Sequence, residues 1–190
     1  LMPMPLKVKP YQHQIRGYNL ACSSMGIIQN GTYICPGYAL LMEMGTGKTL
    51  TSVAITGRAF LDGKTKRLLI LAPKSIVAVW EEEFEKFADF PYSLTILSGS
   101  STNKVRQLKE ITSRGLEVAV VNYDSVPLIE NELLKWSPAF IICDESSKIK
   151  NPSAKMSKST HRIAKQCKYR LILTGTPVQN NPLDFYSQYK

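Results

Sequence analysis

The sequence lacks any long apolar run, and this absence limits the class of protein it can encode. The uncharged stretch that comes nearest to such a run, 18–42, is interrupted by asparagine, serine, glutamine, glycine and proline. A membrane-spanning helix needs about 18 or more consecutive apolar residues. The first ten residues are also too short and too proline-rich for a signal peptide. We therefore expect a protein with no membrane partner.

Cysteine and histidine are scarce and scattered. The chain has 4 cysteines and 2 histidines, no C-x-x-C spacing, and no histidine cluster near a cysteine. Structural zinc is therefore not expected, and the default is a reduced, intracellular protein of the cytoplasm, nucleoid or nucleus. Cys143, inside an apolar run, is interpreted as a small core residue.

Acidic residues are outnumbered, with 15 against 24 Lys and Arg and a net charge of +9. The segment 146–170 contains no acid at all. Its eight cations are Lys148, Lys150, Lys155, Lys158, Arg162, Lys165, Lys168 and Arg170. Such a block is either the solvated face of a helix or a surface for a polyanion, and the lack of compensating acids favours nucleic acid.

With 190 residues, 44% of them hydrophobic, the chain suits one globular domain.

A glycine-rich segment, 42–49, carries the clearest chemical signal. It follows an uncharged apolar run, 38–42, and precedes a stretch with helical spacing of apolar residues. This arrangement is typical of a phosphate-binding loop, in which the backbone N–H groups of Met44, Gly45, Thr46 and Gly47 surround the phosphates of ATP. Lys48 would reach the β and γ oxygens, and Thr49 would offer its hydroxyl to Mg²⁺.

This loop is a variant of the usual pattern. Met42 stands where G-x-x-x-x-G-K-[ST] has its first glycine, and a chance Gly-Lys-Thr in a surface turn is the alternative interpretation. A second motif favours the nucleotide site. The apolar run 140–143 ends in Asp144 and Glu145, as in a Walker-B strand whose Asp holds Mg²⁺ and whose Glu orients the attacking water.

Apolar runs alternate with amphipathic segments along almost the whole chain. We expect strands near 38–42, 67–72, 93–97, 117–121, 139–143 and 169–173. Helices are expected near 12–24, 48–60, 75–88, 102–113, 126–134, 153–166 and 182–190. Strands that are apolar on both faces fit a parallel sheet covered by helices. The predicted fold class is therefore α/β, a doubly wound and mostly parallel sheet with nucleotide at the carboxyl ends of its strands.

With the motifs in this order, the chain resembles the first motor lobe of the Swi/Snf family, helicase-like ATPases of superfamily two with a RecA-like fold. The segment 11–17 looks like the adenine-side glutamine motif, with Gln14 as its glutamine, and 42–49 like motif I. Segments 71–75 with 80–84, 120–124, 144–151 and 170–177 are similar to motifs Ia, Ic, II and III.

The resemblance implies an ATP-driven translocase lobe on double-stranded DNA, using ATP and Mg²⁺. It implies catalytic roles for Lys48, Asp144 and Glu145, and DNA contacts at one set of positions: Lys74, Ser75, Ser98, Gly99, Asn122 and Tyr123. Residues similar to those that couple hydrolysis to DNA are Ser147, Thr174, Gly175 and Thr176. Ser147 departs from the family pattern, which has histidine there.

We also expect 1–190 to be one ATP-binding lobe, monomeric, whose partner is a second motor lobe outside this chain. No Q-x-x-x-R-x-x-R-like segment, which the second lobe would supply, occurs in the sequence. A strand-separating helicase, a nuclease-linked translocase, a non-catalytic DNA-binding module and an RNA-binding ATPase are the alternatives. Intact Lys48, Thr49, Asp144 and Glu145 argue against the non-catalytic module.

Overall fold

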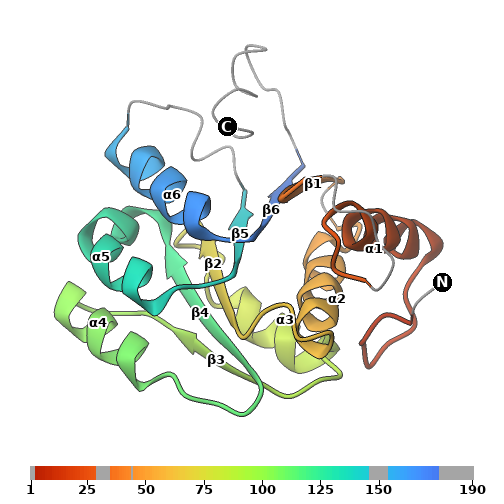
Figure 1. Ribbon diagram of the computed structural model, residues 1–190, viewed down its shortest axis with the longest axis horizontal. Coiled ribbons are helices and arrows are strands. Elements are labelled where there is room, and N and C mark those ends of the chain that lie inside the picture. Colours follow the sequence, from red (N-terminus) through yellow and green to blue (C-terminus); the bar gives the residue numbers. More distant parts are fainter. Residues whose placement is uncertain (1–2, 29–34, 44, 146–153, 176–190) are drawn as a thin grey trace.

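The computed structural model describes residues 3–28, 35–43, 45–145 and 154–175 (Figure 1). Strands and helices alternate along this chain. The strands are β1 (Gly37–Leu41), β2 (Arg67–Ala72), β3 (Tyr92–Ile96), β4 (Leu116–Asn122), β5 (Phe140–Asp144) and β6 (Tyr169–Thr174). The helices are α1 (Gln12–Ser24), α2 (Lys48–Leu61), α3 (Val79–Phe87), α4 (Ser101–Glu110), α5 (Val126–Trp136) and α6 (Lys155–Gln166), with a 3₁₀ turn, η1 (Tyr123–Ser125), before α5.

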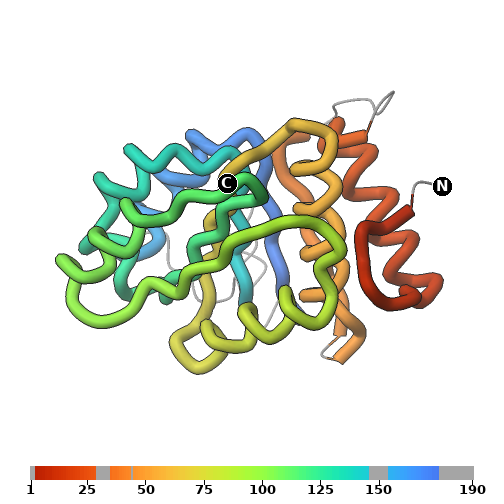
Figure 2. Tube along the Cα trace, turned by 90° about the horizontal axis from the view of Figure 1, so that it is seen from below, coloured from red at the N-terminus to blue at the C-terminus, as the bar shows by residue number. Residues whose placement is uncertain are grey.

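The described strands form one parallel sheet in the order β1-β6-β5-β2-β4-β3. The fold is thus the doubly wound α/β class that the sequence predicts. A parallel sheet must be covered on both faces, because each crossover places a helix against it. In Figures 1 and 2, α1, α2 and α3 lie on one side of the sheet and α4, α5 and α6 on the other.

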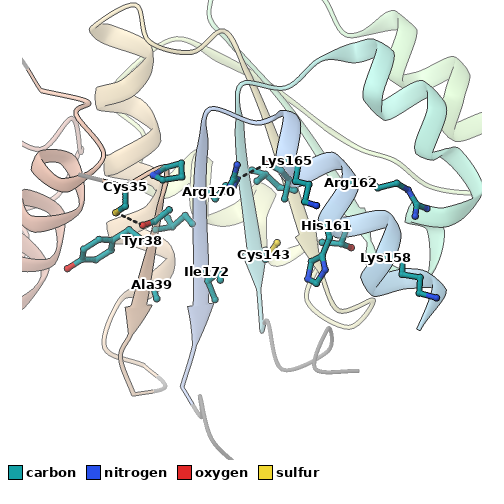
Figure 3. Close-up of a pocket in the computed structure, with 16 residues that line it drawn as sticks. Cys35, Tyr38, Ala39, Cys143, Lys158, His161, Arg162, Lys165, Arg170 and Ile172 are labelled. Carbon is teal, nitrogen blue, oxygen red and sulfur yellow. Dashed lines mark hydrogen bonds between the residues drawn. The ribbon is translucent and has the colours of Figure 1, made fainter. Parts of the chain in front are cut away.

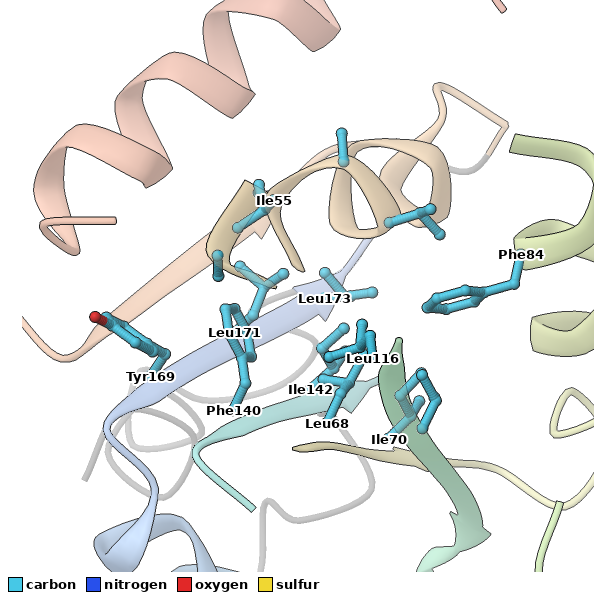
Figure 4. Close-up of a cluster of buried hydrophobic side chains, with 14 of the residues drawn as sticks. Ile55, Leu68, Ile70, Phe84, Leu116, Phe140, Ile142, Tyr169, Leu171 and Leu173 are labelled. Atoms are coloured by element: carbon cyan, nitrogen blue, oxygen red, sulfur yellow. The ribbon is translucent and has the colours of Figure 1, made fainter. Parts of the chain in front are cut away.

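Each face of the sheet has its own apolar core. The core beneath α1–α3 joins Ile55 and Phe84 from the helices to strand residues such as Ile70, Ile142 and Leu171 (Figure 4). The core on the opposite face joins α4, α5 and α6 to the outward side of the same strands. Burial on both sides explains why the strand sequences are continuous apolar runs rather than alternating ones.

All carboxyl ends of the strands meet at one edge of the sheet, because the strands are parallel. That edge therefore receives the phosphate loop after β1, the β2–α3 segment, and the last residues of β4, β5 and β6. Residues that are far apart in sequence, such as Lys48 and Asp144, are thereby brought together.

In the part of the chain that the structure describes, no helix is long and apolar enough to cross a membrane.

The predicted elements agree with the observed ones to within a few residues, with one shift worth noting. The sequence predicts a helix over 75–88, whereas α3 begins only at Val79. Successive turns occupy 74–78, with backbone bonds such as that from Ile76 N to Pro73 O. The helix expected over 182–190 lies outside the described residues.

Candidate nucleotide-binding site

The phosphate loop connects β1 to the first turn of α2. Two of its glycines adopt left-handed backbone angles, with φ of 78° at Gly45 and 89° at Gly47, which is the N-cap of α2. Residues that carry a side chain rarely adopt these backbone angles, so glycine is required for the turn. The backbone N–H groups at the start of α2 and the positive end of the helix dipole then face the same edge, an arrangement that suits an anion.

Lys48 is held by the loop itself. Its Nζ donates to the carbonyl oxygens of Met42 at 2.7 Å and Glu43 at 3.0 Å. The ammonium therefore lies beside the turn. A lysine so held is a point charge that can exchange carbonyl partners for phosphate oxygens.

Helix α1 braces the loop from the outside. Gln14 Nε2 donates to Thr46 O at 3.2 Å, while its Oε1 accepts from Tyr11 N at 2.8 Å. His13 Nε2 also lies 2.8 Å from Thr46 O. Gln14, predicted as an adenine contact, is buried against the loop, and its amide contacts the loop backbone. His13, for which the sequence predicts no role, thus contacts the phosphate loop from α1.

The acid pair lies at the carboxyl end of β5. Asp144 is buried, and burial raises the pKa of its carboxyl. The Trp80 hydrogen bond and the nearby Lys48 act in the opposite direction, and the resulting pKa is about 6. Glu145 has a φ of 48°, a left-handed angle that is uncommon outside glycine. Such a conformation persists only where neighbouring contacts hold it, and it is often found at functional sites.

Two aromatic residues hold Asp144 from inside the fold. Trp80 of α3 donates from Nε1 to Asp144 Oδ2 at 3.0 Å. Tyr123, in η1, donates from its hydroxyl to the main-chain oxygen of Asp144 at 2.8 Å. Trp80 is buried in the core, and no local signal in the sequence indicates its bond to a residue 64 positions away.

The donor atoms at this edge suit a hard cation. Thr49 offers a hydroxyl and Asp144 a carboxylate, the oxygen ligands that Mg²⁺ prefers. A carboxylate has about four lone-pair positions, so Asp144 can keep its Trp80 bond and still bind a metal. Among the described residues there is no group of three or more His, Cys, Asp or Glu side chains suited to a metal. Mg²⁺ is usually bound in proteins by one or two carboxylates together with phosphate oxygens and waters.

Most of the predicted DNA contacts are accessible at the same edge. Lys74 and Ser75 are exposed after β2, and Ser98 and Gly99 are exposed after β3. Asn122 is half-buried at the end of β4, where its Oδ1 accepts from Ser125 Oγ at 2.7 Å.

Tyr123 is the exception. Only 3% of it is exposed, and its hydroxyl is bonded inside the lobe. A DNA contact by this side chain is therefore not supported, and the residue serves as an internal support of Asp144.

The predicted coupling residues are only partly described. Thr174 is buried at the end of β6, next to β5, and Gly175 follows it, half-buried. Met44, Ser147 and Thr176 lie outside the described residues.

Two cavities lie near β1, and they differ in their relation to the loop. A cavity of about 490 Å³ is lined by His13, Gly17, Met42, Glu43 and Thr46, so it borders the phosphate loop on the α1 side. This is the space beside the loop where a base could extend from the phosphates.

The other cavity, of about 530 Å³, lies between α6 and the β1–β6 pair (Figure 3). Lys158, His161, Lys165 and Arg170 are among its lining residues. Neither the described phosphate loop nor Asp144 lines it, so it is separate from the nucleotide site.

Comparison with known proteins agrees with this geometry. Residues 11–188 match the SNF2-related domain family. The SWI2/SNF2 ATPase core of Sulfolobus solfataricus, solved in complex with double-stranded DNA, superimposes with a TM-score of 0.79 at 26% identity, covering 99% of this chain and 36% of that one. The phosphate loop, the acid pair and the RecA-like sheet therefore occur in a chain that belongs to the SNF2-related family.

Curated relatives include DNA repair and helicase proteins. The chain is 28% identical to the DNA repair and recombination protein RAD54B of Gallus gallus over 186 residues, which are 95% of this chain and 19% of that protein. It is 30% identical to Helicase SWR1 of Cryptococcus neoformans over 146 residues, which are 76% of this chain and 12% of that protein. The chain thus spans a fifth or less of the length of these relatives.

Proposed function

We propose that this chain is the ATP-binding lobe of an ATP-dependent translocase that moves on double-stranded DNA. The observation that carries the proposal is the meeting of Lys48, Asp144 and Glu145 at one edge of a RecA-like sheet, in a chain of the SNF2-related family. The solved relative was captured with double-stranded DNA, which supports the same substrate here.

The chemistry we propose is attack of water on the γ-phosphate of ATP. Lys48 binds the β and γ oxygens and stabilises the charge that develops on them. Thr49 and Asp144 are the residues that would hold Mg²⁺, which when bound neutralises phosphate charge. Glu145 orients the attacking water. The α1 side of the loop, lined by His13, receives the base.

DNA binds, in this proposal, along the carboxyl edge beside the nucleotide. Lys74, Ser75, Ser98, Gly99 and Asn122 contact the backbone, as phosphate contacts position a protein without reading sequence. A second RecA-like lobe closes over the edge and completes the site. A relative of this chain is named as a DNA repair and recombination protein. This name supports a location where DNA is present, the nucleus or nucleoid.

ATP titration tests the nucleotide site directly. The 190-residue chain should bind ATP with Mg²⁺, and Lys48→Ala should weaken binding about 10- to 100-fold, because a hydrogen bond to a charged group contributes about 1.5–3 kcal/mol. Lys109→Ala, at an exposed lysine on the last turn of α4, is the matched control and should bind like the parent. Equal affinity of a folded Lys48→Ala protein would contradict the site.

A further inference from the structure

The acid pair at the end of β5 has an inner layer of support that belongs to other elements. Trp80 contacts the Asp144 carboxylate and Tyr123 contacts its main-chain oxygen, so the residue is held at two separate points. Both supports are almost fully buried, at 1% and 3% exposure. Solvent therefore cannot easily replace either hydrogen bond.

We propose that Trp80 and Tyr123 are positioning residues for the nucleotide site: Trp80 fixes the Asp144 carboxylate for Mg²⁺, and Tyr123 fixes the peptide that leads to Glu145. This inference rests on the proposed function, since it assigns roles relative to Mg·ATP. Neither residue touches the nucleotide in this proposal. Each acts through the acid that it holds.

The indole of Trp80 is itself locked in place. Its ring lies 6.4 Å from that of Phe84, which in turn packs at 5.1 Å from Tyr92 and 6.3 Å from Phe90. A donor on a rigid aromatic cluster orients its acceptor more strictly than a donor on a flexible chain, because little rotamer freedom remains. Partners of this kind, one layer behind a metal ligand, orient the ligand and tune its affinity.

Tyr123 acts on the backbone rather than on a side chain. The carbonyl it holds belongs to the peptide between Asp144 and Glu145, and Glu145 is the residue with left-handed φ. Such a backbone conformation needs neighbouring contacts to keep it.

The test compares ATP affinity in the presence of excess Mg²⁺ and in EDTA, by calorimetry on the 190-residue chain. The ratio of the two dissociation constants is the gain that Mg²⁺ contributes. Trp80→Phe should lower this gain about 10- to 100-fold, as expected when a ligand loses its outer partner. Tyr123→Phe, which removes one oxygen, should lower it about two- to tenfold. Affinity in EDTA should change less than about twofold in both, because Lys48 and the loop are untouched.

Two matched variants control for the loss of a buried aromatic group. Trp136→Phe removes an indole whose buried Nε1 has no hydrogen-bond partner among the described residues. Tyr18→Phe removes a hydroxyl that donates to the main-chain oxygen of Pro3, away from the acid pair. Both should keep the parental Mg²⁺ gain.

If folded Trp80→Phe and Tyr123→Phe proteins also keep the parental Mg²⁺ gain, the positioning role is overturned while the nucleotide site stands. If the parent binds no ATP at all, the proposed function fails first and the inference with it.

A fluorescence measurement leaves Trp80 in place and so does not depend on the stability of its variant. The chain has two tryptophans, so in Trp136→Phe all indole emission comes from Trp80. Adding Mg²⁺ to this protein with ATP bound should shift that emission, because the carboxylate bonded to the indole gains a cation. The same addition without ATP should leave it unchanged. Unchanged emission while calorimetry records Mg²⁺ binding would overturn the role of Trp80.

Discussion

At the scale of single residues, the two glycines of the phosphate loop have different reasons to be glycine. Gly45 and Gly47 both have left-handed φ, but only Gly47 is crowded. A Cβ added at Gly47 would lie 2.2 Å from Gln14 Nε2, whereas one at Gly45 would meet nothing within 4 Å. Gly47 is therefore required both for the turn and for the contact with α1 that braces it.

We expect Gly47→Ala to destabilise the fold more than Gly45→Ala. Both carry a left-handed strain of about 1–2 kcal/mol, but Gly47→Ala also displaces the buried Gln14 amide from Thr46, which costs a further ~1–3 kcal/mol. Denaturant unfolding without nucleotide measures the difference.

The double variant Gln14→Ala/Gly47→Ala provides the control. Its loss of stability should be smaller than the sum of the two single losses, because the crowded side chain is gone. Equal destabilisation by Gly45→Ala and Gly47→Ala would contradict this account. So would a loss of stability in the double variant equal to the sum of the two single losses.

At the scale of elements, the direction of α6 divides its basic residues between the two edges of the sheet. The helix leaves the carboxyl end of β5 and returns to the amino end of β6. Lys155 and Lys158, on its first turns, are therefore nearer the carboxyl edge, while Lys165 is near the opposite edge. Arg162 is paired with Glu130 of α5, so part of the basic block is already neutralised within the lobe.

Duplex DNA binding by this lobe should be weak, non-specific and salt-sensitive, with unequal contributions from these lysines. Each phosphate contact lowers the slope of log K against log salt by about 0.9. Lys74→Ala and Lys158→Ala should each make the slope shallower by about that amount, and Lys165→Ala should leave it unchanged. Fluorescence anisotropy across a salt series measures the slopes. A flat response in the parent would remove nucleic acid as the reason for the charge.

The elements show what the sequence could and could not predict. Strands such as β2 and β4 were predictable because burial on both faces requires continuous apolar runs. The phosphate loop and acid pair were predictable because their chemistry depends on neighbouring residues. The Trp80–Asp144 and His13–Thr46 contacts were not predictable from the sequence, since they depend on the order of the strands in the sheet. Because β2 lies beside β5, the helix α3 that follows β2 lies next to Asp144.

At the scale of the whole molecule, one edge of one sheet presents the proposed nucleotide and DNA contacts together. Several of the arginines that the structure describes are already bonded within the lobe. Arg58, Arg67 and Arg162 are paired with Asp62, Glu117 and Glu130, and Arg170 donates to Ala164 O near the amino edge. The chain also covers 36% of the solved ATPase core. In the function that we propose, a second lobe supplies the cation for the transferring phosphate from across the carboxyl edge.

The 190-residue chain should therefore bind ATP but hydrolyse almost none, even with saturating duplex DNA. An arginine finger contributes about 10³–10⁵ in rate, or roughly 4–7 kcal/mol of transition-state stabilisation, and Lys48 alone cannot replace it. A longer form that carries a second RecA-like lobe should recover DNA-stimulated turnover in a phosphate-release assay. In that form Glu145→Gln should abolish turnover while ATP binding persists, because the glutamine keeps the shape but loses the charge that orients water. Turnover of several ATP per second by the 190-residue chain itself, rising with DNA, would show that one lobe suffices and that the cation lies within it.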